Sequence, residues 1–312
     1  MASSSVRRLR GMAVAAAVAA VTLTGALLAP TAVAAPPEAD ESATQAPGQW
    51  APADSAAIRP GIMTDTAGAA CTSNFVFTSG ERVFIGQAAH CAGTGEATET
   101  NGCDSATLPE GTPVTLRATD GTERTGVLAY SSWIAMQDSG ETDPNICQYN
   151  DFGLVEIDPA DVADVNPSIP VFGGPTGVDD DGLPAGEQVF SYGNSPLRAG
   201  VMELSPKTGI SAGDVGEGNG HEVFTFTPGV PGDSGSAFLD SDGEAVGVLS
   251  TLNIAPLAGS NGIADVARAM EYARTVGGLE DLQLVLGTEA FTPSPAGLPL
   301  AALATPAGPP VR

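Results

Sequence analysis

Basic residues and histidines are scarce in this chain of 312 residues. It has 12 lysine and arginine residues against 37 aspartate and glutamate residues, a formal net charge of −25, and two histidines. Such an acidic surface repels nucleic acid and anionic lipid. We therefore expect no nucleic-acid partner, and any chemistry that depends on histidine must use His90 or His221.

Cysteines are also few, and no CxxC pair or Cys/His cluster is present. This indicates no zinc site, and no metal and no cofactor are expected. Asp179-Asp180-Asp181 could offer oxygen ligands to calcium but does not match an EF-hand loop, and we interpret it as a solvated acidic turn. Four cysteines in an exported chain favour two disulfides, with three possible pairings. They are Cys71, Cys91, Cys103 and Cys147.

Long hydrophobic runs are confined to the N-terminus. Three arginines precede a run of mostly Ala, Val and Leu from Met12 to Leu28, and Ala32-Val33-Ala34 offers a signal-peptidase cleavage site. Residues 1–34 are therefore predicted to be a signal peptide, the alternative being an N-terminal anchor helix. No later stretch is apolar enough to span a bilayer. We expect a secreted, extracellular protein without a stable membrane anchor.

Composition divides the rest of the chain into three parts. Residues 35–60, rich in Ala, Pro, Asp and Glu, are predicted to be a linker or pro-segment. Many short β-type runs follow, separated by turn signals such as Asp120-Gly121, which is typical of an all-β sandwich or barrel. A helical pattern is clear only near Ile263–Met270 and would stop at Gly277-Gly278. Residues 279–312 are predicted to be a largely disordered tail.

Three short motifs contain the residues of a hydrolytic site. A serine nucleophile needs a histidine base, a carboxylate that orients the imidazole, and backbone N–H donors for the oxyanion. Each motif alone could have a purely structural role, because Asp-Ser-Gly strings and Asp before a strand are common in turns. The motifs are Gln87-Ala88-Ala89-His90-Cys91, Asn150-Asp151-Phe152-Gly153-Leu154-Val155 and Pro231-Gly232-Asp233-Ser234-Gly235-Ser236.

Together, and in this order, the motifs resemble those of the chymotrypsin-like (trypsin-like) serine peptidase family, secreted bacterial type. The resemblance implies an endopeptidase with His90, Asp151 and Ser234 as catalytic triad and an acyl-enzyme intermediate. It implies an oxyanion hole formed by the N–H groups of Gly232 and Ser234. Peptides or proteins are the expected substrates, and a monomer is the expected state.

The resemblance also implies an all-β fold of two six-stranded antiparallel β-barrels with a C-terminal helix. The peptidase domain would span 61–278, with barrel one at about 61–165, barrel two at about 183–262 and the helix at about 263–276. In the family, cysteines at the positions of Cys71 and Cys91 form a disulfide beside the histidine, which leaves Cys103 for Cys147.

Specificity is predicted from two further segments. In the family, the position of Pro228 lies at the base of the primary specificity pocket, and Ser250, Thr251 and Leu252 match a strand that pairs with the substrate. None of these side chains is charged, so an uncharged P1 residue is expected. Asp233 needs an ion-pair partner, for which Arg198 is one candidate.

Other functions remain open at this stage. A catalytically silent binding protein could share the fold, and an esterase could share the triad. An α/β-hydrolase is disfavoured because Ser236 replaces the last glycine of its elbow and no histidine follows Ser234. His221 is interpreted as an exposed loop histidine.

Overall fold

The computed structural model describes residues 43–44, 50–95, 100–253 and 259–293, so the predicted signal peptide lies outside the described residues. Within these ranges the chain is mostly β, with a closed six-stranded barrel, a second antiparallel sheet and few helices. The predicted fold class is thereby confirmed. No helix in the described ranges has the length and apolar character needed to cross a membrane.

The first sheet has nine strands, more than the six predicted for barrel one. Its first pair, β1 with β15, is parallel, and every other pair is antiparallel. In spatial order the strands are β1 (Ala43–Thr44), β15 (Gln283–Val285), β4 (Val76–Ser79), β5 (Arg82–Gln87), β8 (Gly153–Glu156), β7 (Glu123–Ser131), β6 (Pro113–Arg117), β2 (Met63–Thr66) and β3 (Ala69–Thr72).

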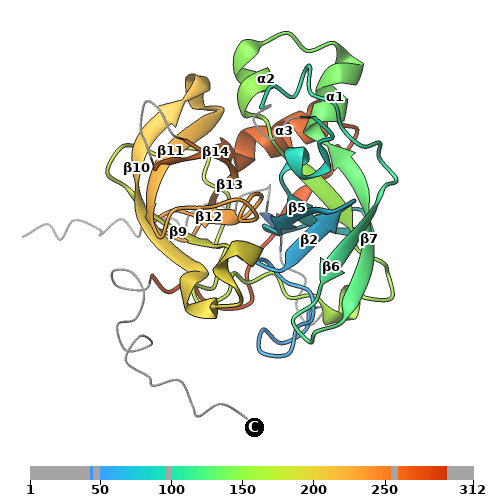
Figure 1. Cartoon of the computed structure of the whole chain (residues 1–312), viewed down its shortest axis with the longest axis vertical. Helices are drawn as coiled ribbons and strands as arrows, with labels where there is room; N and C mark the ends of the chain where they lie inside the picture. The colour runs from blue at the N-terminus through green and yellow to red at the C-terminus, as the bar shows by residue number, and fades with distance from the viewer. Residues whose placement is uncertain (1–42, 45–49, 96–99, 254–258, 294–312) are drawn as a thin grey trace, which may run out of the picture. The chain divides into compact units, whose positions relative to one another are not determined.

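The second half of the chain closes into a six-stranded barrel, seen beside the blue and green strands of the first sheet in Figure 1. Alternate residues of its strands point inward and form an apolar cluster that includes Val189, Val223 and Ile263. In barrel order the strands are β10 (Pro206–Val215), β11 (Gly220–Phe226), β14 (Asn261–Asp265), β13 (Ala245–Leu252), β12 (Ala237–Leu239) and β9 (Gln188–Tyr192).

The helices differ in part from the prediction. The C-terminal helix α3 is Val266–Thr275 and not 263–276, because Ile263 lies in β14 and the Asp265 side chain caps the helix by accepting from Arg268 N at 2.6 Å. Helices α1 (Ser132–Ser139) and α2 (Pro144–Tyr149) are not predicted, since both are too short for a periodic pattern. The 3₁₀ helices are η1 (Ala89–Ala92), η2 (Val162–Asp164), η3 (Pro196–Arg198), η4 (Met202–Leu204) and η5 (Gly216–Gly218).

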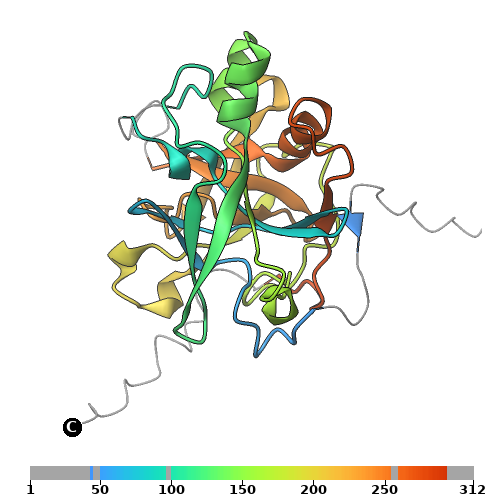
Figure 2. The same ribbon diagram turned by 90° about the vertical axis from the view of Figure 1, so that its right-hand side faces the viewer.

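Helices α1 and α3 and the 3₁₀ helix η1 pack against one another. Trp133 and Met136 of α1 pack with Tyr272 of α3 and Ala89 of η1. Figure 2 shows the green and the red-brown helices beside one another. The cluster fixes η1, which contains His90, against the C-terminal helix.

The predicted domain boundaries also need correction. Residues 50–60, predicted as linker, pack on the domain: Ile58 is fully buried and bridges to Val165. At the other end, Leu282 and Leu284 are buried, β15 joins the first sheet, and the Phe291 ring packs on Phe190. Apolar side chains in both segments therefore extend the folded unit beyond the predicted limits of 61 and 278.

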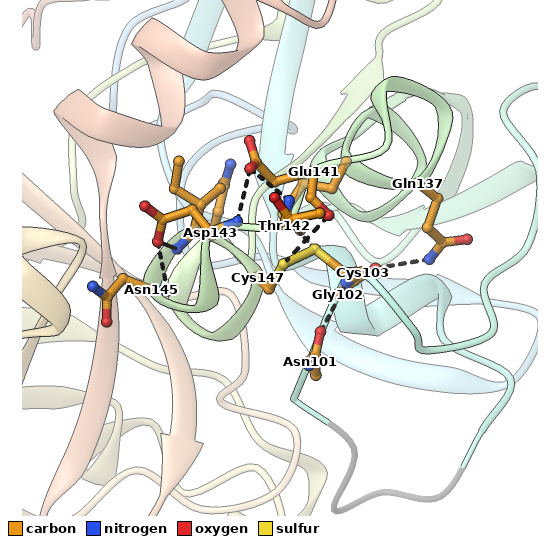
Figure 3. Close-up of a disulfide and its surroundings, with 12 residues drawn as sticks. Asn101, Gly102, Cys103, Gln137, Glu141, Thr142, Asp143, Asn145 and Cys147 are labelled. Atoms are coloured by element: carbon orange, nitrogen blue, oxygen red, sulfur yellow. Dashed lines mark hydrogen bonds between the residues drawn. A yellow bond between two sulfur atoms is a disulfide. The ribbon is translucent and has the colours of Figure 1, made fainter.

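Two disulfides link Cys71 to Cys91, as the resemblance implied, and Cys103 to Cys147, as elimination predicted. The second one ties the segment at residue 102 to α2, as Figure 3 shows. Gln137 of α1 donates to Gly102 O at 2.7 Å, and Asp143 caps α2 by accepting from Asn145 N at 2.8 Å. This arrangement fixes α2, the element that leads directly into Asp151.

Candidate active site

His90 and Asp151 form a close pair. Asp151 Oδ2 lies 2.6 Å from His90 Nδ1, and the His90 backbone N donates to Asp151 Oδ1 at 2.8 Å. Burial by itself lowers the pKa of His90, but the carboxylate of Asp151 outweighs this effect and raises that pKa above its ordinary value. Nδ1 is thereby held on Asp151 and Nε2 is left to act on another group.

The chain on both sides of Asp151 is held by a single hydroxyl. Ser132 Oγ donates to Asn150 O at 2.8 Å and accepts from Phe152 N at 3.0 Å. Ser132 is the first residue of α1, and it is fully buried. Asp151 itself is 2% exposed. Because the backbone is held on both sides of it, the direction of its carboxylate is fixed as well.

Ser250, which is predicted to bind substrate, has a side chain that contacts Asp151. Its Oγ donates to Asp151 Oδ2 at 2.5 Å from β13 of the barrel. Burial alone would raise the pKa of Asp151, but His90 and the hydroxyl of Ser250 hold that pKa below its usual range. The carboxylate thus stays ionised and joins the two halves of the molecule.

Ser234 lies in a loop that is clamped between the first sheet and the barrel. Ser234 O accepts from Thr72 N at 2.8 Å, next to the Cys71–Cys91 disulfide, and Gly235 N donates to Leu249 O at 2.7 Å. A Cβ at Gly235 would lie 2.9 Å from Ala88 N. The structure thus brings the serine loop against the segment that leads to His90.

The hydroxyl of Ser234 and Nε2 of His90 have no hydrogen-bond partner among the residues that the structure describes. In the same part of the chain, the backbone N–H groups of Gly232 and Ser234 are also without an acceptor. Gly232 has a φ of +95°, a conformation that glycine adopts without strain. The two N–H groups predicted for the oxyanion hole are therefore free donors.

Asp233, between these donors, is the centre of a buried ion-pair cluster. Arg198 Nη2 lies 2.5 Å and Lys207 Nζ 3.2 Å from its Oδ2. Ser195 N donates to Oδ1 and Val230 N to Oδ2. Burial would raise the pKa of Asp233, but the two cations lower it. The sequence suggested Arg198 as an ion-pair partner of Asp233. It did not suggest Lys207, although a lysine that occurs only once in the chain could have been noticed as a candidate.

The residues predicted for the specificity pocket are only partly where expected. Pro228 is exposed, and its carbonyl accepts from Arg198 Nη2 at 3.2 Å. The buried residue is its neighbour Gly229, whose N donates to Asn261 Oδ1 at 2.8 Å, while Asn261 Nδ2 donates to Thr251 O at 3.1 Å. Asn261 therefore ties together the two segments that were predicted as pocket walls, and nothing in its sequence context marked it.

The end of β13 is open to solvent. Leu252 is 43% exposed and Thr251 is half-buried. Beyond Leu249, the described residues pair with this strand only on its β14 side. As far as the described residues go, one edge of 250–252 is thus left free for an added strand.

His221 is buried, not exposed as predicted. It lies on β11 with no exposed surface, with Nδ1 at 2.8 Å from Asp214 Oδ1 and Nε2 at 3.0 Å from Asp265 Oδ2. Burial opposes its charge, but Asp265 and Asp214 raise its pKa. Since both ring nitrogens are bound, His221 is not free to act as a base.

The predicted acidic turn is also partly buried. Asp179 is 6% exposed and lies with Asp240 and Glu244, their carboxylate oxygens within 4.8 Å of one another. Burial and the nearby carboxylates raise the pKa of Asp179 to about 6. Only one side of this turn is therefore solvated.

A scan against protein-family models and a search of curated proteins found no match. Solved structures of serine proteases do match. Protease A of Thermobifida fusca has a TM-score of 0.46 at 18% identity, over 74% of this chain and 100% of that one. Nocardiopsis protease has 0.42 at 20% identity, over 73% and 98%. The serine endoprotease of Yersinia pestis has 0.42 at 15% identity, over 72% and 64%.

The described structure itself comprises a closed six-stranded barrel, a second antiparallel sheet and a C-terminal helix, with candidate catalytic groups contributed by both halves. The chain is therefore mostly β, with the barrel and the C-terminal helix that the resemblance of its three motifs implied.

Proposed function

We propose that the chain is a serine endopeptidase with His90, Asp151 and Ser234 as its catalytic residues. The observation that carries the proposal is the 2.6 Å pair of His90 and the buried Asp151, together with a serine loop that packs against Ala88 and has two free N–H donors among the described residues. A base, its orienting carboxylate and an oxyanion site are the parts that acyl transfer requires.

The reaction follows from these groups. Ser234 Oγ attacks the peptide carbonyl carbon as His90 Nε2 takes its proton, and Asp151 stabilises the imidazolium. The N–H groups of Gly232 and Ser234 hold the oxyanion. His90 then gives the proton to the leaving amine, which leaves an acyl-enzyme on Ser234. A water molecule, deprotonated by His90, then attacks the acyl carbon. The bond to Ser234 Oγ breaks, His90 returns the proton to that oxygen, and the acid product leaves.

For the substrate we propose an extended peptide that adds to the free edge of Ser250–Leu252, with an uncharged P1 residue. The amide of Asn261, the only polar side chain that links Gly229 and Thr251 in the described structure, carries no charge. The Arg198 side chain near Pro228 is 8% exposed and bound to Asp233, so it is not available to select an acidic residue. Cleavage only after charged residues in a peptide library would contradict this preference.

We also propose that the protein is exported, with residues 1–34 removed as a signal peptide. The two disulfides support an oxidising compartment. N-terminal sequencing of protein recovered from the culture medium tests this directly. A mature chain that still begins at Met1 would contradict it.

Labelling with a fluorophosphonate, which reacts only with an activated serine, tests the catalytic proposal. We expect the wild type and the exposed-serine control Ser241→Ala to be labelled and Ser234→Ala not to be. Turnover of casein should fall by about 10⁶-fold in Ser234→Ala. Because the pKa of His90 is raised, activity should rise with pH through a value above the ordinary 6.5 and be absent at pH 4.

One observation favours a second candidate, a silent binding protein on the same fold. In the described structure no hydrogen bond joins Ser234 to His90. Catalytic bonds of this kind often tighten only when substrate binds, so we rank this candidate second. A wild-type chain that binds peptides but resists the fluorophosphonate would establish it.

A further inference from the structure

The outer face of the second barrel is apolar over β9, β10 and β11. Val189 and Val223 belong to the cluster inside the barrel, and successive residues of a strand point to opposite faces, so the residues next to them point outward. The outward side chains line a groove of about 280 Å³, and none of the described residues that line it is charged. These side chains are Gln188 and Phe190 of β9, Thr208 and Ile210 of β10, and Phe224 and Phe226 of β11.

Exposure differs between the two edges of this groove. At β9, Phe190 is 2% exposed because the rings of Phe172 and Phe291 pack on it, at centroid distances of 5.5 and 5.4 Å. On the other two strands, Ile210 is 50% exposed and Phe226 is 63% exposed. Single exposed apolar side chains are ordinary, but a continuous apolar face indicates a contact surface. The described chain therefore covers one edge of the groove and leaves an uncovered part over β10 and β11.

The last described residues of the chain lie at the covered edge. The Phe291 ring packs there, Thr292 N donates to Phe172 O at 2.7 Å, and Pro293 is exposed. Residues 294–312 follow directly and lie outside the described residues. They therefore begin beside the groove.

The uncovered part is within reach of these residues. Thr208 lies opposite Phe190 of β9 and also opposite Phe226 of β11. Two strand spacings, about 10 Å, therefore separate the covered ring from the exposed one. An extended chain spans this distance within about four residues. The first leucine after Pro293 is Leu298, which leaves enough chain between them.

The sequence after Pro293 suits an uncharged apolar groove. Residues 294–312 contain no Asp or Glu, although the whole chain has 37 of these residues. Proline restricts itself and the residue before it to extended backbone, and prolines stand at 293, 295 and 299. In an extended chain Leu298 and Leu300, two positions apart, point to the same side. Proline-rich segments lose little entropy when they bind aromatic grooves.

The N-terminal segment is a poorer match for the groove. Between the predicted signal peptide and β1 it contains Glu38, Asp40 and Glu41. Covering an uncharged surface with three carboxylates would remove them from water without a partner, which is costly. Chemistry therefore favours the segment after Pro293.

We propose that residues 293–300 dock across the uncovered part of the groove, with Leu298 and Leu300 packing on the phenylalanine rings of β11. The inference goes beyond the proposed function and does not rest on it. Composition alone predicted a disordered tail, and docking would order only the part that lies on the groove.

Docking within one chain needs only a weak contact. A segment joined by a short linker has an effective concentration of about 1 mM, so a contact with a Kd of about 100 μM is about nine-tenths occupied. The same contact between separate molecules in dilute solution would be almost empty. The groove is therefore expected to be covered by its own chain rather than by another.

The first measurement is a crosslink in the full chain. The photocrosslinker p-benzoylphenylalanine is incorporated in place of Leu300, and crosslinked peptides are identified by mass spectrometry after illumination in dilute solution. We expect an intramolecular crosslink to β10 or β11. The same group in place of Val311 is the control and should not concentrate on these strands. A crosslink from position 300 that is found only on the first sheet or on another copy would overturn the inference.

The second measurement is the rate at which hydroxyl radicals label the Phe226 ring. It compares the wild type with Leu298→Asp/Leu300→Asp, which places charge on the groove. The matched control, Ala307→Asp/Val311→Asp, adds the same charge farther along. Loss of docking should raise the labelling rate about 3- to 10-fold in the first variant. The control variant should keep the wild-type rate.

The remaining outcomes are distinct. Equal labelling of Phe226 in the three proteins would mean that the groove is not covered by this segment, and would overturn the inference. Protection that increases with protein concentration and ignores the aspartates would identify a second copy as the occupant, which also overturns it. If the first variant fails to fold, the crosslink alone decides. None of these results bears on the labelling of Ser234 by a fluorophosphonate, so the peptidase proposal stands or fails separately.

Discussion

The buried histidine His221 offers the sharpest test of the electrostatic reasoning. Its imidazole donates to Asp214 and Asp265 from its two nitrogens and must be protonated to do so. We consider His221→Gln, which keeps a similar volume but carries no charge. Asp265, 5% exposed, would then lose its cation while still capping α3 through Arg268 N.

The magnitude follows from burial. Removing one partner of a buried ion pair costs about 3–5 kcal/mol, because the remaining charge is left uncompensated. The glutamine amide can replace one of the two hydrogen bonds, so we expect a loss of about 3 kcal/mol at pH 6. Asp214 contributes less, since its side chain is 43% exposed and solvent screens it.

The pH dependence has a definite sign. The folded-state pKa of His221 is raised above the ordinary 6.5, so its stabilisation is fully present below pH 6.5 and is lost as pH rises through the folded value. The wild type therefore loses this contribution at alkaline pH, and the variant has none to lose. The difference between the two should shrink toward pH 9.5.

Urea unfolding, followed by the fluorescence of the two tryptophans, measures this difference at pH 6 and pH 9.5. Asp214→Asn is the matched control and should lose less than about 1 kcal/mol. The reasoning would be refuted by an equal loss at both pH values, or by a control variant as unstable as His221→Gln.

Three further predictions concern other contacts. Ser250→Ala removes a hydrogen bond to the buried carboxylate of Asp151, an interaction that contributes about 1.5–3 kcal/mol. The variant should therefore have a kcat/KM for peptide hydrolysis about 10- to 100-fold lower, and an unchanged value would contradict this. Replacing Cys103 and Cys147 by serine removes a crosslink across 44 residues. The free energy of unfolding, measured by urea titration, should fall by about 4 kcal/mol. A loss below about 1 kcal/mol would refute this prediction. The raised pKa of Asp179, about 6, means that the folded state disfavours the charged carboxylate. Asp179→Asn should therefore stabilise the protein by about 1–2 kcal/mol at pH 8 but not at pH 4.5. Melting temperatures that rise equally at both pH values would count against this.

The sequence predicted those features that depend on neighbouring residues. Short β-type runs and their turn signals indicated an all-β fold, and the described structure has a closed barrel and a second sheet. The motif around His90 and the motif around Asp151 were found because each is contiguous. Helix α3 was predicted from its apolar periodicity, although its start was placed too early because β14 runs directly into it.

Contacts between distant segments were predicted poorly. The hydrogen bond from Ser250 to Asp151, 99 positions away in the chain, was not predicted. His221 has turn-forming neighbours and was read as exposed, yet β10 and the start of α3 enclose it. Segment 50–60 has a linker-like composition, but a few apolar residues such as Ile58 are enough to anchor it.

The sequence by itself determined the fold class, the three contiguous motifs that contain His90, Asp151 and Ser234, and an acidic chain with four cysteines. Only the tertiary structure decided which charges are buried and which groups share them: Lys207 with Asp233, His221 with two carboxylates, and Asp151 with both His90 and Ser250. The physical reason is that residue type and local spacing set hydrophobic pattern and turns, whereas burial and charge pairing arise only when strands far apart in sequence close around one interior.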